Sequence, residues 1–234
     1  MRRIHAPTID QAWIDFSCQQ RLSIAEEVAQ YTALVATKTS NHLQTVSGRG
    51  VCIPSLMQGH PQESPIHHWF PRTVGPMSSV QYRAYMKSIS SHLPPEFADD
   101  LVLYHDDQGP TNISISNDGN SVATIIDWAN VAYLPRFWVA TAPLTVAGFM
   151  LEDDKPPMSA RGGWGRMLST ALTAQGFQEC VPEYRAWINK VFKSDTAKDL
   201  AEWVTRTLPF PLFLHQQRIL RYSTNAPFAS KKTR

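Results

Sequence analysis

Neither sign of charge is in excess in this sequence of 234 residues. It holds 22 Lys and Arg residues against 20 Asp and Glu residues, a formal net charge of +2. The basic residues are scattered, except for a short cluster at residues 231–234. Proteins that bind nucleic acid concentrate positive charge on one face, so we expect no nucleic-acid partner. We interpret residues 223–234 as a flexible basic tail.

Long hydrophobic runs are missing too. The most apolar stretch, residues 137–151, is shorter than the roughly 20 residues that a membrane-spanning helix needs, and it contains Pro143. We therefore expect a buried helix there and no membrane partner. The first residues, Met1-Arg2-Arg3, are basic but no apolar segment follows them, so we expect no secretory signal.

Cysteine is scarce and unpatterned. The three cysteines, Cys18, Cys52 and Cys180, are far apart, odd in number, and without the spacing of a metal or redox site. This use of cysteine favours a reducing compartment, and we predict a cytoplasmic protein. The chain is 43% hydrophobic and 18% charged, which is typical of one folded domain, so we expect a single domain over residues 1–234.

A cluster of polar residues whose spacing is typical of a functional site follows the apolar run of residues 101–104. Residues 101–104 read as a buried strand that ends at a polar cluster. In that cluster His105, Asp107 and Asn112 form a His-x-Asp-x-x-x-x-Asn pattern. A strand that delivers such side chains to a loop is typical of a functional cleft.

A predicted hairpin follows the cluster. Residues 112–116 alternate apolar and polar side chains, residues 117–120 are turn formers, and residues 122–126 are apolar again. Asp127 comes directly after the second strand. Because the hairpin folds back on itself, we expect Asn112 and Asp127 to lie side by side, with Asp107 one loop away.

These side chains match the needs of phosphoryl transfer. Mg²⁺ prefers oxygen ligands and needs only one or two from the protein, which Asn112 and Asp127 would provide. A further carboxylate, Asp107, would orient or deprotonate the attacking hydroxyl. Taken singly, Asp106 and Asp107 could be ordinary loop acids and Asn112 a loop cap. The joint pattern favours the functional interpretation.

The sequence resembles the C-terminal lobe of the aminoglycoside phosphotransferase and choline kinase-like family, a branch of the protein-kinase-like fold. Members of that family carry a His-Gly-Asp-Leu-x-x-x-Asn loop, followed by a hairpin that ends in Ile-Asp-Trp or Ile-Asp-Phe. Here the loop spans residues 105–112 and the hairpin ends in Ile126-Asp127-Trp128. The fold that this resemblance implies is α+β and mostly α-helical, with a small β-hairpin at the cleft.

The resemblance also implies roles. Asp107 would be the catalytic-loop aspartate, Asn112 and Asp127 would hold Mg²⁺ with ATP, and His105 would brace the loop. Three positions depart from the family: Asp106 replaces the usual Gly, Gln108 replaces Leu, and Ala129 stands where many relatives have an acid. These three departures do not affect the phosphate-handling positions, but they leave the substrate side of the pocket unspecified.

The other half of a kinase-like site is not found in this sequence. It contains no GxGxxG, no Walker A motif and no strand-like Lys segment before residue 100. We interpret residues 1–22 as a remnant of the hinge between two lobes, and Gly162–Gly165 as a loop. Charge-assisted hydrogen bonds contribute about 1.5 to 3 kcal/mol each, so losing two or three would weaken nucleotide binding roughly 10²-fold to 10⁶-fold.

The remaining sequence predicts mostly helices. One begins with Ser23 as N-cap and Glu26 completing a capping box. We expect helices over residues 23–37, 78–93, 158–175, 182–192 and 196–207. We expect a long irregular connection over residues 44–77 with surface histidines at 67 and 68, an acidic loop over residues 152–157, and core positions for Trp164, Trp187 and Trp203.

Three functions remain open. The first is a kinase that transfers the ATP γ-phosphate to a small-molecule hydroxyl. The second is a lobe repurposed as a nucleotide-independent biosynthetic enzyme that uses its acids in general acid-base catalysis. The third is a non-catalytic protein that binds a ligand or partner, either as a homodimer or with a chain that supplies the missing lobe. The sequence does not specify the substrate.

Overall fold

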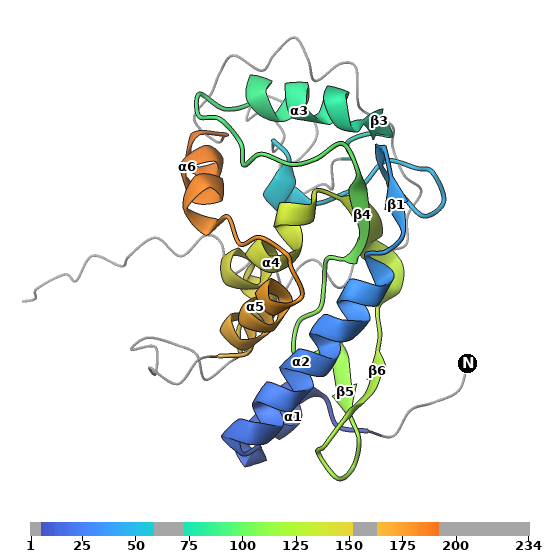
Figure 1. Cartoon of the computed structure of the whole chain (residues 1–234), viewed down its shortest axis with the longest axis vertical. Coiled ribbons are helices and arrows are strands. Elements are labelled where there is room, and N and C mark those ends of the chain that lie inside the picture. The colour runs from blue at the N-terminus through green and yellow to red at the C-terminus, as the bar shows by residue number, and fades with distance from the viewer. Residues whose placement is uncertain (1–5, 59–72, 152–162, 192–234) are drawn as a thin grey trace, which may run out of the picture.

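The computed structural model describes residues 6–58, 73–151 and 163–191 and has an α+β fold (Figure 1). The α-helices in these ranges are α1 (Ile9–Ala12), α2 (Cys18–Val35), α3 (Ser79–Ser88), α4 (Arg136–Thr145), α5 (Trp164–Ala174) and α6 (Val181–Val191). Short 3-10 helices span Trp13–Asp15, Pro54–Leu56, Trp128–Asn130 and Ala147–Phe149.

The strands form two antiparallel sheets. The larger has the order β1 (Thr39–Ser40), β4 (Leu101–His105), β7 (Val131–Leu134), β2 (His42–Thr45) and β3 (Met77–Ser78). The smaller is the predicted hairpin, with β5 (Ile113–Ile115) and β6 (Val122–Ile125). The strand before the polar cluster and the hairpin are thus confirmed, whereas the sheet that β4 joins was not predicted.

Helix α2 begins earlier than the sequence suggested. Its N-cap is Ser17, whose Oγ accepts a hydrogen bond from the Gln20 backbone N–H at 3.2 Å, while Gln20 Oε1 accepts one from the Ser17 N–H at 3.0 Å. The predicted N-cap at Ser23 with Glu26 is therefore wrong. Both pairs fit the capping-box pattern, but Ser17 has the extended backbone of an N-cap, whereas Ser23 lies inside the helix.

Two further expectations change between α2 and β4. Helix α3 ends at Ser88 and not at residue 93, and the Ser90 hydroxyl then donates to the Trp187 carbonyl at 2.9 Å, which binds the chain to α6. The segment 44–77 is not wholly irregular, because it holds the end of β2, the start of β3 and a bridge between Val51 and Val74. His67 and His68 lie outside the described residues.

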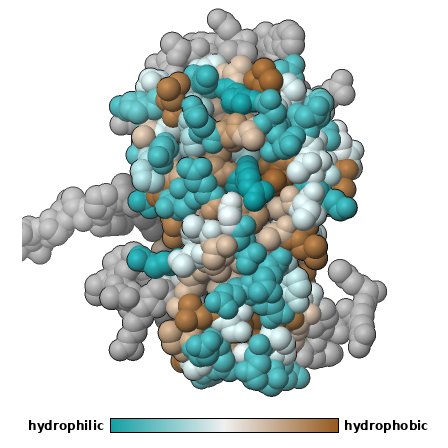
Figure 2. All heavy atoms as spheres, in the orientation of Figure 1, coloured by the Kyte–Doolittle hydropathy of each residue, from teal (hydrophilic) through white to brown (hydrophobic). Residues whose placement is uncertain are grey.

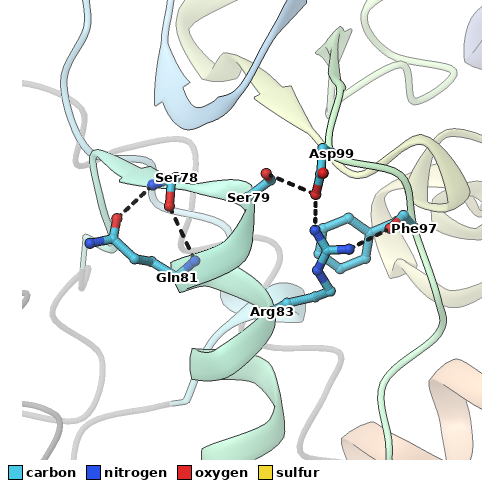
Figure 3. A network of polar contacts seen from close by, with 6 residues as sticks. All are labelled: Ser78, Ser79, Gln81, Arg83, Phe97 and Asp99. Carbon is cyan, nitrogen blue, oxygen red and sulfur yellow. Dashed lines mark hydrogen bonds and ion pairs between the residues drawn. The ribbon is translucent and has the colours of Figure 1, made fainter.

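A polar network holds the start of α3 against the segment that leads into β4 (Figure 3). Ser78 caps α3 by accepting from the Gln81 N–H at 3.2 Å. From α3, Arg83 forms an ion pair with Asp99 on the facing segment and donates to the Phe97 carbonyl there at 3.1 Å. Because β4 begins at Leu101, two residues beyond Asp99, these contacts help to set the strand that carries the candidate site.

Trp138, Trp164 and Trp187 are fully buried, which confirms the core positions expected of the last two. Gly162–Gly165 is not simply a loop, since Gly163 is the N-cap of α5 and Trp164 starts the helix. A Cβ on Gly165 would lie 2.2 Å from the Pro143 carbonyl oxygen, so α4 and α5 meet there in close contact. Trp203 and the expectations for residues 152–157, 196–207 and 223–234 lie outside the described residues.

The buried apolar residues form one cluster that runs from Ile9 to Val191. Helix α2 contacts α5 and β6 and lies between α5 and the hairpin (Figure 1). The face seen in Figure 2 carries mostly polar side chains, with apolar ones scattered among them. Among the described residues, no helix is long and apolar enough to cross a membrane.

Candidate functional site

The loop after β4 is held to the end of the hairpin by His105. The imidazole is buried, and its Nδ1 accepts a hydrogen bond from the Asp107 backbone N–H at 3.1 Å. With Nδ1 accepting, the proton sits on Nε2, which donates to the Ile126 carbonyl at 2.9 Å. A neutral imidazole of one defined tautomer thus connects the Asp107 backbone to the residue before Asp127.

Asn112 lies where the loop becomes the hairpin. Its Nδ2 donates to the Asp107 carbonyl at 2.9 Å, and its own carbonyl accepts from the Ile126 N–H at 2.9 Å. Because the amide carries oxygen and nitrogen on opposite sides of Cγ, Oδ1 faces away from the Asp107 carbonyl. Asn112 is buried, so the orientation of this amide is well determined by its surroundings.

Asp127 follows β6 in an unusual backbone conformation. Its φ of 62° and ψ of 52° are left-handed, and it is the one non-glycine among the described residues with a positive φ. Such backbone conformations cost free energy, less for Asp than for most residues, and they concentrate at functional sites. The register that pairs Ile113 with Ile125 puts Ile126 opposite Asn112, and Asp127 is the next residue in the chain. Asp127 is half-buried.

The side chain of Asp107 lies beside a close backbone crossing. A Cβ on Gly148 would be 3.6 Å from Asp107 Oδ1, and one on Gly109 would be 3.8 Å from the same atom. A Cβ on Gly109 would also lie only 2.2 Å from the Gly148 carbonyl oxygen, so this position requires glycine. The structure therefore brings the segments of His105, Asp107, Asn112 and Asp127 together, through contacts of their own atoms or of neighbours.

Gln108, which stands at the usual Leu position, ties the loop to two helices. Its buried amide Nε2 donates to Thr32 Oγ1 of α2 at 2.9 Å, and its backbone carbonyl accepts from Trp164 Nε1 of α5 at 3.0 Å. A buried amide with these partners fixes the loop by hydrogen bonds where a leucine would do so by packing alone. Gln108 therefore has a structural role in this loop.

Asp106 is the residue that sequence reasoning missed, having treated it as an ordinary loop acid. Its carboxylate Oδ1 accepts a hydrogen bond from Trp138 Nε1 at 2.5 Å. Burial raises the pKa of Asp106 to about 7, the Trp138 hydrogen bond lowers it, and the negative charge of Asp107 raises it.

A groove of about 280 Å³ lies beside the loop, between α2, β4 and β6. Its walls are mostly apolar, and His105, Gln108 and Thr32 add polar atoms to its lining. Three lining residues are also large and exposed: Tyr31 at 43%, Leu34 at 68% and Trp128 at 45%. The Trp128 and His105 rings pack edge to face, with their centroids 4.9 Å apart. This contact connects the wall of the groove to the loop.

Asn112 and Asp127 carry oxygen atoms of the kind that Mg²⁺ prefers as ligands. Across the described residues, no group of three or more His, Cys, Asp or Glu side chains could hold a metal ion. A metal here would rest on Asn112 Oδ1 and the Asp127 carboxylate, with water or substrate oxygens completing its shell. Mg²⁺ is the common ion that accepts so few protein ligands, all of them oxygen.

Comparison of the chain with protein-family models, with curated proteins and with solved structures finds no match.

Proposed function

We propose that this protein is a phosphotransferase with a kinase-like C-terminal lobe, which moves the γ-phosphate of ATP to the hydroxyl of a small molecule. The observation that best supports the proposal is the double hydrogen bond of His105, to the Asp107 N–H and to the Ile126 carbonyl. Through this imidazole, the segment of a candidate base and the segment of a candidate metal ligand form one rigid unit.

Each residue has a distinct task in this proposal. Asp107 accepts a hydrogen bond from the substrate hydroxyl, orients it and takes its proton as the oxygen attacks phosphorus. Asn112 Oδ1 and the Asp127 carboxylate are the protein ligands of Mg²⁺, which when bound with ATP neutralises charge on the phosphates. Neutral His105 positions both segments and needs no change of protonation.

The sequence supplies no glycine-rich loop to cover the phosphates. Under the proposal, these contacts come from protein outside the 234 residues, for example from a second copy of this chain or from another chain. The chain alone then binds nucleotide weakly, since roughly 10²-fold to 10⁶-fold in affinity depends on two or three such contacts.

Thermal unfolding with and without Mg²⁺ and ATP tests the site. A ligand at about 100 times its Kd stabilises the folded state by about 2.7 kcal/mol, or on the order of 4 to 10 °C in Tm. We expect a shift in wild type that requires Mg²⁺ and that Asp127→Asn abolishes. Asp118→Asn is the matched control, because Asp118 is an exposed turn residue of the same hairpin. A shift unchanged in Asp127→Asn, or no shift in wild type at saturating nucleotide, would contradict the proposal.

The apolar groove favours a second candidate function, in which the protein binds a partner chain without catalysis. Exposed Leu34 and Trp128 beside a groove are the kind of surface that proteins use for association. Under this alternative the chain self-associates, and Leu34→Glu lowers its mass in sedimentation equilibrium. The control is Leu93→Glu, since Leu93 is equally exposed, at 76%, but does not line the groove.

A further inference from the structure

The carboxyl group of Asp106 lies among aromatic side chains from four different elements. Trp138 of α4 donates to it, and its charge contributes to raising the pKa of Tyr82 of α3, Tyr104 of β4 and Tyr184 of α6. Of these, Tyr82, Tyr104 and Trp138 are almost wholly buried. Asp106 thus joins the candidate loop to the helical core.

This surrounding offers an anion little hydrogen bonding. The Tyr82 hydroxyl donates to the Leu56 carbonyl at 2.9 Å, and the Tyr184 hydroxyl donates to the Ser55 carbonyl at 2.8 Å. The Tyr104 hydroxyl is buried and has no hydrogen-bond partner among the described residues. Trp138 Nε1 is therefore the side-chain donor that the described residues provide to Asp106, for a carboxylate with about four lone-pair sites.

The charged neighbour of Asp106 adds repulsion. Asp107 follows it directly, and its negative charge raises the pKa of Asp106 in addition to the effect of burial. The other titratable groups around the carboxyl are the three tyrosines, all with raised pKa and neutral at physiological pH. His105 precedes Asp106 in the chain. The neutral form of Asp106 is the one that fits the folded protein.

We propose that Asp106 is a positioning residue for Asp107 that works through its own proton. When the Asp106 carboxyl is neutral, the loop of residues 106–112 packs against the aromatic core. When the carboxyl loses its proton to solvent, the anion is better solvated if it moves toward water. The loop then packs less tightly against the aromatic core. The effect on nucleotide rests on the proposed function, whereas the movement of the loop does not.

The direction with pH follows from linkage. A carboxyl whose pKa is raised in the folded state keeps its proton there at a pH where the unfolded chain has already lost it. Its stabilising contribution is complete below the unfolded value near 4 and is lost as the pH rises to the folded value of about 7. Opening of the loop therefore becomes more favourable from acid pH up to pH 7. It carries Asp107 away from His105 and Asn112, which bond its backbone.

The test is an NMR titration from pH 5 to pH 8.5 that follows two signals, the Trp138 indole N–H and the Asp107 backbone amide. We expect both to move with one midpoint near 7 in wild type. In Asp106→Asn both should be flat. Asp118→Asn, an Asp-to-Asn change at an exposed position of the neighbouring hairpin, should titrate as wild type does.

Three results would overturn the proposal. If the Asp107 amide still titrates in Asp106→Asn, another group such as His105 causes the movement. If Trp138 titrates but Asp107 does not, Asp106 changes charge without positioning its neighbour. If neither signal moves between pH 6 and 8 in wild type, Asp106 does not titrate there. Should Asp106→Asn fail to fold, Trp138→Phe decides: it removes a hydrogen bond that lowers the pKa of Asp106, so the Asp107 midpoint should rise.

Nucleotide binding separates this inference from the proposed function. Thermal shifts with Mg²⁺ and ATP at pH 6 and pH 8 should be larger at pH 6 in wild type and equal in Asp106→Asn. No shift at any pH in either protein would remove the proposed function, yet the NMR titration would still decide the role of Asp106. A shift of equal size at both pH values in wild type would leave the phosphotransferase proposal standing and overturn this one.

Discussion

His105 is the single side chain whose removal should disturb the candidate site most. It is the hydrogen-bond partner of both the Asp107 N–H and the Ile126 carbonyl, and it is itself buried. We predict that His105→Ala lowers the free energy of unfolding by about 2 to 4 kcal/mol, since each buried polar group left unpaired costs about 1 to 3 kcal/mol.

Urea unfolding at pH 7.5 measures this loss. The matched control is His42→Ala, because His42 is exposed and its ring bonds to the neighbouring Asn41 side chain. We expect a change within about 0.5 kcal/mol for the control. Equal effects of the two substitutions would mean that the imidazole of His105 does not hold the loop and the hairpin together.

At the residue scale, the sequence predicted which residues form the candidate site more readily than it predicted what surrounds each of them. The spacing of His105, Asp107, Asn112 and Asp127 was enough to predict that they lie near one another, because a hairpin of this length permits one return path. The burial of Asp106 was not predicted, since it depends on Trp138 and on tyrosines from distant parts of the chain. Long-range neighbours of this kind leave no local pattern in the sequence.

At the scale of elements, the start of α2 gives a direct test of the capping assignment. Ser17 makes both contacts of a capping box with Gln20, whereas Ser23 lies exposed in the helix interior. We predict that Ser17→Ala costs about 1 kcal/mol of stability, and that Ser23→Ala is neutral or stabilises by up to about 0.5 kcal/mol because Ala is the better helix former.

Chemical denaturation of the two variants side by side checks this prediction, with the m-value as a guard against changes in the unfolded state. A loss of about 1 kcal/mol at Ser23 and none at Ser17 would reverse the assignment and restore the helix start that the sequence suggested.

The crossing between the candidate loop and the 3-10 helix Ala147–Phe149 gives a second test at this scale. Ala at Gly109 would place its Cβ 2.2 Å from the Gly148 carbonyl oxygen, which is part of the backbone and can move only with its segment. Ala at Gly148 would meet nothing closer than Asp107 Oδ1 at 3.6 Å, an ordinary contact. We predict that Gly109→Ala destabilises by at least about 2 kcal/mol and that Gly148→Ala is tolerated within about 1 kcal/mol.

Thermal unfolding followed by circular dichroism compares these two glycine variants. A tolerated Gly109→Ala would mean that the loop and the 3-10 helix do not approach as described. The position of Asp107 beside Gly148 would then need revision as well.

Elements were predictable where their patterns were long or had a turn at a known place. The hairpin β5–β6 and strand β4 satisfy this condition, as do the described helices α5 and α6. The other strands of the larger sheet, such as β1, β2 and β3, have only two to four residues each. So short a strand shows no alternation, and it forms because a neighbouring strand offers it a partner: β4 for β1, β7 for β2, and β2 for β3.

At the scale of the whole molecule, one core implies one unfolding transition. The buried apolar cluster includes Ile24 of α2 and Trp187 of α6, at opposite ends of the described chain. Trp187 also donates from Nε1 to the Met86 carbonyl of α3 at 2.9 Å, so α6 is tied to the centre of the chain. We predict that far-ultraviolet circular dichroism and tryptophan fluorescence report the same urea midpoint in wild type.

A single core also predicts how substitutions at two distant buried positions change the unfolding transition. Ile24→Ala and Trp187→Ala each remove a fully buried side chain, at a cost of about 2 to 5 kcal/mol. In a single cooperative unit, each should shift both spectroscopic transitions by the same amount. If Trp187→Ala moved the fluorescence transition and left the circular dichroism transition in place, α6 would unfold separately. The chain would then contain two units, and the aromatic surroundings of Asp106, which include Tyr184 of α6, could open without the loss of the hairpin and its candidate ligands.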